Sequence, residues 1–305
     1  MSESTLFGAG ANTCANIFTY MGLPLSRDLS DQVDAVVMGV PYDLATSGRS
    51  GTRLGPTGIR QASSQLRWEE KRWPWTFSLA EKLRVIDYGD ICFDDGDHNH
   101  MVEQVVTEAG KIIKANKTLL TLGGDHYISL PLLRAVAKTH GKLALLHFDA
   151  HTDTEKSDNA YYHGSMFYQA QKEGLIDPGK SIQVGIRTEY DYDNHEYTVL
   201  DAPWANSHSP ERIVERIRAA IGDGPTYLSF DIDCLDPAFA PGTGTPVAGG
   251  LSSDKALQVI RGLQGLNIVA MDVMEVAPAY DHAEVTSLAA ATLALEMLHV
   301  VAATR

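Results

Sequence analysis

The stretch 143-LALLHFDAHTD-153 runs from near-continuous apolar residues directly into Asp149, His151 and Asp153. A run of this kind, without polar and apolar residues alternating, is typical of a strand covered by helices on both faces. Comparable runs occupy residues 35–40, 83–86, 118–122, 182–186, 226–230 and 268–273. Helical patterns lie between them, at residues 102–115, 129–139, 209–221 and 253–263. This alternation predicts an α/β fold: one three-layer α/β/α domain with a central, mainly parallel sheet.

The composition is that of a globular protein with an acidic surface. The 305 residues are 44% hydrophobic and 21% charged, which is enough apolar material for a large core. No repeat or linker interrupts the chain, so we predict a single domain over residues 1–305, with residues 1–30 packing on it or on a neighbouring subunit. The net charge of −14 argues against nucleic-acid and anionic-membrane partners, which need a basic surface. It modestly favours cationic ligands.

Cysteine use and apolar segments bear on the cellular compartment. Cys14, Cys92 and Cys234 are too few and too scattered for a disulfide framework or a thiolate zinc site. Residues 1–20 lack the basic start and the apolar run of a secretory signal. The apolar tail at 288–301 is shorter than a membrane span and contains a glutamate. We therefore expect a cytoplasmic protein without a membrane segment.

Metal-ligand side chains follow four of the apolar runs directly, at residues 123–126, 149–153, 231–233 and 275. Ligands of parallel α/β sheets collect beyond the carboxyl ends of the strands, so these groups are expected at one edge. Residues two apart on extended backbone point the same way, which lines up the Asp-x-His-x-Asp and Asp-x-Asp motifs. The ligands that we expect are His126, Asp149, His151, Asp153, Asp231 and Asp233.

Four buried carboxylates require positive charge, because they repel one another and lose their hydration. Two divalent ions would balance them, and oxygen ligands with two imidazoles suit Mn²⁺ first, with Zn²⁺, Co²⁺ or Fe²⁺ open by affinity alone. A pair of ions roughly 3.5–4 Å apart lowers the pKa of water and supplies a nucleophile at neutral pH. A lone Asp-x-Asp could be an ordinary strand-end cap, but two such motifs with a Gly-Gly-Asp-His turn favour a metal site. His147 is expected as a hydrogen-bonded core histidine, and His195 is given no role.

At these residues the sequence resembles the ureohydrolase family of arginases and agmatinases. The resemblance implies an arginase-like fold, two Mn²⁺ per subunit and a homo-oligomer, either a trimer or a hexamer. The matching stretches are GVPYD at 39–43, GGDH at 123–126, FDAHTDT at 148–154, SFDIDCLDP at 229–237 and APGTGTP at 240–246. By this resemblance one ion is held by His126, Asp149, Asp153 and Asp231, and the other by Asp149, His151, Asp231 and Asp233.

The resemblance also assigns two roles outside the metal ligands. It implies that His163 moves protons and contacts the substrate, acting with Asp153 in catalysis, and that Glu275 binds a guanidinium group. A carboxylate can hold this planar cation by two charge-assisted hydrogen bonds, and a histidine can protonate the departing amine. From residue type and position alone, His163 could equally be a surface loop residue and Glu275 a strand-end capping acid.

The loop 155-EKSDNAYY-162 bears on the rest of the substrate. It contains no arginine and more acids than lysines, which suits a substrate that ends in an amine. We therefore predict cleavage of agmatine to putrescine and urea, a step of putrescine and spermidine biosynthesis. Arg49 and Arg53 keep 4-guanidinobutyrate open as an alternative, since either could reach a carboxylate. Absence of basic residues beside the ligand motifs argues against a metallophosphoesterase, and His163 with Glu275 argues against a non-catalytic metal-binding scaffold.

Overall fold

The central sheet has eight strands, all parallel, in the order β2-β1-β3-β8-β7-β4-β5-β6. The computed structural model describes residues 19–159 and 161–305. The predicted fold class is confirmed. The strands are β1 (Ala35–Val40), β2 (Val85–Asp90), β3 (Thr118–Gly123), β4 (Ala144–Phe148), β5 (Ile182–Ile186), β6 (Thr198–Asp201), β7 (Thr226–Asp231) and β8 (Ile268–Met274).

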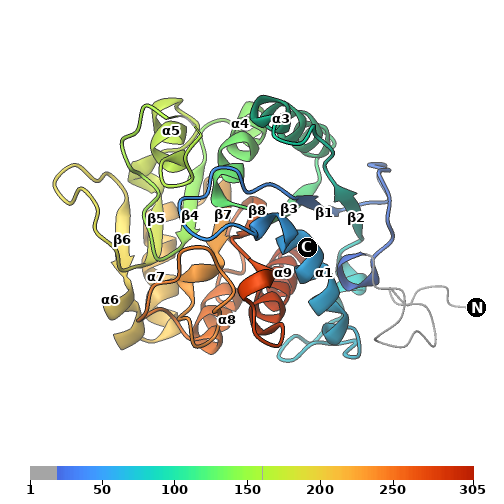
Figure 1. Cartoon of the computed structure of the whole chain (residues 1–305). Coiled ribbons are helices and arrows are strands. Elements are labelled where there is room, and N and C mark those ends of the chain that lie inside the picture. Colours follow the sequence, from blue (N-terminus) through green and yellow to red (C-terminus); the bar gives the residue numbers. More distant parts are fainter. Residues whose placement is uncertain (1–18, 160) are drawn as a thin grey trace, which may run out of the picture.

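Helices cover both faces of the sheet and make the three layers. Figure 1 shows α3, α4 and α5 on one face and α1, α6, α7, α8 and α9 on the other, and the buried side chains divide into the same two clusters. The helices are α1 (Gly55–Ser63), α2 (Leu79–Lys82), α3 (His98–Lys114), α4 (Ser129–His140), α5 (Met166–Lys172), α6 (Ala202–Ser207), α7 (Pro210–Ile221), α8 (Ser253–Arg261) and α9 (Val285–Ala303).

Two strands differ from the sequence prediction. The edge strand β6 is short and half-buried, so it lacks the continuous apolar run by which the inner strands were found. Strand β2 extends further than predicted, into a polar segment containing Asp87. That carboxylate is fully buried and pairs with Arg60, with 2.8 Å between Oδ2 and Nε. An ion pair is therefore buried at a strand that the sequence pattern identified only by its apolar residues.

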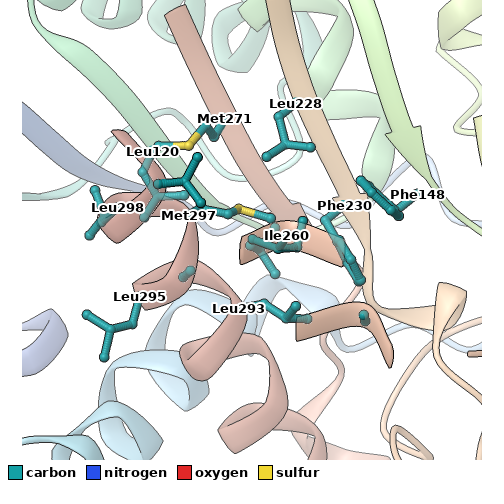
Figure 2. Close-up of a cluster of buried hydrophobic side chains, with 14 of the residues drawn as sticks. Leu120, Phe148, Leu228, Phe230, Ile260, Met271, Leu293, Leu295, Met297 and Leu298 are labelled. Atoms are coloured by element: carbon teal, nitrogen blue, oxygen red, sulfur yellow. The ribbon is translucent and has the colours of Figure 1, made fainter. Parts of the chain in front are cut away.

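Helix α9 is buried over most of its surface, between α1, α8 and the strand β8. Figure 2 shows Leu293, Met297 and Leu298 beside side chains of the sheet and of α8. The helix extends beyond the predicted apolar segment 288–301, and its 19 residues are long and apolar enough to cross a membrane by length and composition. Of its most apolar stretch, 83% is buried within the fold, which is the environment of a core helix.

The beginning of the described chain is tied to the domain at two distant points. The Tyr20 N–H donates to Asp87 Oδ2 at 2.7 Å, and the Tyr20 hydroxyl donates to the Ala291 carbonyl on α9 at 2.7 Å. Residues 1–18, with Cys14 and most of the segment considered for a secretory signal, lie outside the described residues. The predicted role of residues 1–30 as a packed extension therefore stays a prediction.

Candidate metal centre

Four neighbouring strands, β3, β8, β7 and β4, deliver the site from their carboxyl ends. Buried apolar residues near the ends of these strands are paired in register across the sheet, so the residues that follow emerge at a similar level. This is the arrangement expected from the four runs in the sequence. The paired residues are Leu122, Val273, Phe230 and Phe148.

The turn after β3 is shaped by close packing at two glycines. A Cβ on Gly123 would lie 1.8 Å from the Met274 sulfur, and one on Gly124 would lie 1.8 Å from the Tyr42 carbonyl oxygen. Neither glycine has a positive φ, so the lack of space for a Cβ requires glycine at both positions, and an unusual backbone conformation does not. Asp125 then accepts the Tyr127 N–H at 3.0 Å and starts the short helix that carries the ligand-type histidine.

His126 lies at the centre of three carboxylates. Its Nδ1 is 3.0 Å from Asp231 Oδ2, 3.2 Å from Asp149 Oδ2 and 3.3 Å from Asp153 Oδ2. Asp153 holds its position with a φ of 52°, in the left-handed region that side chains other than glycine rarely adopt. Such backbone conformations cost of order 1–3 kcal/mol and collect at functional sites.

His151 forms a second group beside the first. Its Nδ1 is 3.3 Å from Asp149 Oδ1 and 3.2 Å from Asp233 Oδ2. Asp149 therefore faces both histidines, with one carboxylate oxygen directed to each. Two sets of atoms could hold an ion: His126, His147, Asp149 and Asp153, and Asp149, His151 and Asp233. All six expected ligands thus lie in one contiguous cluster, with Asp231 joined to it through His126.

The electrostatics of the cluster favour added positive charge. Burial, reinforced by neighbouring carboxylates, raises the pKa of Asp231 and of Asp233. Burial disfavours charging of His151, but its bonds to Asp149 and Asp233 outweigh it and raise the pKa to about 12. In the described part of the chain, no lysine or arginine pairs with the four carboxylates of the cluster. The donor set therefore fits divalent cations, which would displace the protons held by these aspartates and histidines.

A buried hydrogen-bond chain orients His126 from behind. Asp272 is fully buried and accepts the Ser229 hydroxyl proton at 2.8 Å, so the Ser229 oxygen is free to accept from His126 Nε2 at 2.7 Å. With its proton on Nε2, the ring directs the Nδ1 lone pair at the carboxylates, as a metal ligand requires. Sequence reasoning missed this role, although both residues stand out as polar positions in otherwise apolar strands.

Glu275 is buried next to the cluster with one oxygen unused. Its Oε1 accepts the His126 N–H at 2.8 Å and the His163 Nδ1–H at 3.1 Å, while Oε2 has no hydrogen-bond partner. The side chain is only 1% exposed, and the residue has a φ of 66°. An unsatisfied buried carboxylate oxygen is costly, so its presence points to a cationic ligand that completes the bonding.

His163 lies between Glu275 and the open cavity. Burial disfavours its charged form, but the hydrogen bond to Glu275 outweighs this and raises the pKa to about 9. Its Nε2 faces Ser47, 3.0 Å from the backbone nitrogen and 2.8 Å from the hydroxyl. The Ser47 N–H can donate to Nε2 when the ring is neutral. The Ser47 hydroxyl can accept from Nε2–H when the ring is protonated. No sequence pattern pointed to Ser47, which belongs to a loop distant in the sequence.

The cluster opens into a cavity of about 490 Å³ that extends to Glu155, Lys156 and Tyr162 of the loop at 155–162. Asp153, Glu155, Lys156 and His163 form part of its wall, and Glu275 lies behind His163, to which it is hydrogen-bonded. The Lys156 ammonium is 2.9 Å from the Asp191 carboxylate, which is also part of the wall. The positive charge that this loop brings to the cavity is therefore already paired.

The two arginines that could have served a substrate carboxylate point elsewhere. Arg49 donates to the Thr243 carbonyl at 2.7 Å and stacks over the Tyr280 ring at 4.3 Å. Arg53 pairs with the buried Asp43 carboxylate. Neither arginine is part of the cavity wall.

Comparison with known proteins places this centre in a family. The model of the Arginase family matches residues 33–299, which is most of the chain. The chain belongs to the arginase family. The resemblance read from the motifs is thereby confirmed, and the protein is an enzyme, a hydrolase of this family. Its candidate metal centre coincides with the motifs on which that resemblance rested.

Individual relatives are similar over nearly the whole length. An agmatinase of Neisseria meningitidis is 55% identical over 301 residues, 98% of each chain. The crystal structure of a hypothetical agmatinase from Burkholderia thailandensis is 50% identical, with a TM-score of 0.94, and the match covers 99% of this chain and 96% of that one. Proclavaminate amidino hydrolase from Streptomyces clavuligerus is 38% identical, with a TM-score of 0.91, and the match covers 97% and 100%.

Proposed function

We propose that this arginase-family enzyme hydrolyses agmatine to putrescine and urea. The observation that carries the proposal is the free, buried Oε2 of Glu275 next to a cluster of metal-ligand side chains. A guanidinium group would complete the hydrogen bonding of this oxygen and balance its charge. Relatives more than half identical that are named agmatinase support the same substrate.

The proposed cofactor is a pair of Mn²⁺ ions held by the two groups that share Asp149. His126, Asp149, Asp153 and Asp231 would hold one ion, and Asp149, His151, Asp231 and Asp233 the other. When bound, such ions act as Lewis acids and make a water molecule nucleophilic at neutral pH. The mixture of oxygen and imidazole donors suits Mn²⁺, and two divalent charges would balance the four aspartates.

His163 and Glu275 would carry the remaining chemistry. Glu275 fixes the plane of the guanidinium, so that its carbon is presented to the cluster. Water adds to that carbon, and the bond between the carbon and the alkyl-substituted nitrogen breaks to give urea. The departing amine needs a proton, and His163, with its pKa raised to about 9, holds one through the neutral range.

The far end of the substrate is the basis for choosing agmatine over guanidino acids. The acidic side chains Glu155 and Glu189 contribute to the cavity wall, and its lysine is paired with Asp191. A terminal ammonium suits this surface, whereas a carboxylate would lie near like charges without a cationic partner. The alternative, 4-guanidinobutyrate, required Arg49 or Arg53 in the cavity, and both side chains bond elsewhere.

Rates on three substrates test the proposal. With Mn²⁺-loaded enzyme, we expect kcat/KM for agmatine to exceed that for arginine by roughly 10³-fold or more, because an unpaired buried charge costs several kcal/mol. Agmatine should also exceed 4-guanidinobutyrate. A higher value for 4-guanidinobutyrate would replace the substrate and leave the chemistry in place, whereas phosphatase activity without urea release would overturn the proposal.

The cytoplasmic location and the homo-oligomeric state, trimer or hexamer, belong to the same proposal. Light scattering on the purified enzyme separates a monomer from these assemblies by mass. A monomer with full activity would remove the oligomer from the proposal.

A further inference from the structure

Gln183 lies in the middle of β5 and is fully buried among apolar strands. Its amide has hydrogen-bond partners on both sides. The nitrogen is 2.9 Å from His147 Nδ1 and 2.7 Å from the Thr152 carbonyl oxygen. The oxygen is 2.7 Å from His195 Nε2. A buried amide with every partner in place restricts the protonation of the rings around it.

The directions of these bonds follow from chemistry. A carbonyl oxygen can only accept, so the group facing Thr152 must be the NH₂ of Gln183. The same NH₂ faces His147 Nδ1, which must therefore be the unprotonated ring nitrogen. The proton of a neutral His147 then lies on Nε2, where it is donated to Asp149 Oδ2 at 2.7 Å. His195 completes the chain by donating its Nε2–H to the Gln183 oxygen.

We propose that Gln183 is a positioning residue for the metal centre: it keeps the ring proton of His147 on Nε2, so that His147 donates to Asp149, orients it and does not itself bind metal. The inference rests on the proposed role of Asp149 as the ligand shared by both ions. It also decides which side chains of the first group, His126, His147, Asp149 and Asp153, would bind an ion. Both ring nitrogens of His147 are engaged, so His126, Asp149 and Asp153 remain as ligands from that group.

The chain reaches the wall of the substrate cavity. The His195 ring packs against Tyr190, with 4.7 Å between the ring centroids, and Tyr190 is part of the wall. From this ring contact, hydrogen bonds run from His195 through Gln183 and His147 to the carboxylate of Asp149. His195, which had no role by sequence, is the outer end of the chain.

Gln183→Glu tests the inference by removing the donor. A carboxylate cannot donate to His147 Nδ1, so it draws the ring proton to Nδ1, and the hydrogen bond that orients Asp149 is lost. We expect the affinity for Mn²⁺ alone, measured from the electron paramagnetic resonance signal of free Mn²⁺, to fall by about 10–100-fold. ¹⁵N NMR of labelled histidine side chains in the full chain should show His147 changing from the Nε2–H tautomer to the Nδ1–H tautomer.

Gln169→Glu is the matched control. Gln169 is also a buried glutamine and donates to a backbone carbonyl, of Ser157, but it has no hydrogen bond to His147. Its substitution adds the same charge and should leave the Mn²⁺ affinity within about twofold of the original. Equal losses in the two variants, or an Nδ1–H tautomer of His147 in the unsubstituted protein, would overturn the inference. Neither readout uses agmatine, so a wrong substrate assignment leaves this result intact.

Substitutions of His147 keep the test decisive if Gln183→Glu does not fold. His147→Gln places an amide N–H near the position of Nε2 and should keep the Mn²⁺ affinity within about threefold. His147→Leu removes the donor and should lose about 10–100-fold. The inference is overturned if both variants bind Mn²⁺ equally, because donation to Asp149 would then have no influence on the metal.

Discussion

Two regions of this enzyme bury carboxylates and treat them in opposite ways. On α9, Glu296 is fully buried and accepts hydrogen bonds from Arg261 at 2.7 Å, Arg72 at 3.2 Å and Trp75 at 2.6 Å. At the edge of the sheet, four aspartates lie together with histidines as their only basic partners among the described residues. Both groups are hidden from water, so burial by itself does not distinguish a structural acid from a functional one.

The two regions differ in the groups that supply positive charge to the buried carboxylates. Burial raises the pKa of Glu296, but the hydrogen bonds from Arg261 and Trp75 outweigh it, and the net pKa is lowered. For Asp231 and Asp233 burial is reinforced by neighbouring acids, and the pKa rises. A carboxylate with fixed cationic partners completes the fold, whereas crowded carboxylates without them leave room for ions and substrate.

The largest effect is expected from Asp149→Asn. Because this carboxylate faces both ligand histidines, its loss should weaken both metal groups and lower urea release by about 10⁴-fold or more. Metal analysis of the purified variant should find fewer than two tightly held ions. Asp254→Asn, on the exposed start of α8, should behave as the unsubstituted enzyme. A variant at Asp149 that keeps its metal and its activity would remove the contrast between the two regions.

His163→Ala should lower kcat by about 10²–10⁴-fold, the usual size of a general acid contribution, with metal content unchanged. The reason is that His163 contacts Glu275 and the cavity but none of the ligand carboxylates. Steady-state kinetics with metal analysis separates this effect from the loss at Asp149. His282→Ala, at an exposed loop position, is the control. Nearly full activity at neutral pH would make His163 a bystander.

Glu296→Gln should act on stability and leave the chemistry alone. Two arginines lose their buried partner, and we expect the free energy of unfolding to fall by about 3 kcal/mol, which urea denaturation measures. Activity per folded molecule should be unchanged. Glu215→Gln removes the exposed partner of Arg212 and should change stability by no more than about 1 kcal/mol. Comparable small changes in both variants would show that the buried pair on α9 is not a structural support.

The smallest predicted effect is the dependence of kcat on alkaline pH. In the proposed mechanism His163 acts in its protonated form, and its pKa is raised to about 9, so the donor is present below that pH and is lost as the pH rises through it. Above about pH 9, kcat should therefore fall roughly tenfold per pH unit. The alkaline decline should be missing from the residual activity of His163→Ala. The same decline in that variant would assign it to another group.

The sequence was sufficient for the parts of the site that follow from strand geometry. Ligand spacing of two residues and a position at a strand end brought Asp149 and Asp231 to one edge without knowledge of the strand order. The buried partners behind them were out of reach, because they depend on which strands are neighbours. Ser229 meets Asp272 only because β7 lies beside β8, and Gln183 meets His147 only because β5 lies beside β4.

The backbone conformation of two site residues, the short edge strand and the orientations of two arginines could not be predicted from the sequence, for other reasons. The left-handed backbone of Asp153 and Glu275 has no local sequence signal, since the surrounding packing enforces it. Strand β6 is too short and too exposed for an apolar pattern. The orientations of Arg49 and Arg53, which bear on the substrate, are set by side-chain contacts with distant residues.

The burial of α9 has a consequence for how the chain reaches its native state. The helix contacts α1 and is tied by hydrogen bond to Tyr20, more than 270 positions earlier in the sequence. During synthesis the apolar surface of α1 therefore stays uncovered until α9, which ends at residue 303, has left the ribosome. Contacts of such long range are slow to form, and the waiting surface is open to aggregation. Folding of this enzyme is thus limited by the docking of α9. We expect the nascent chain to depend on chaperones until that helix docks.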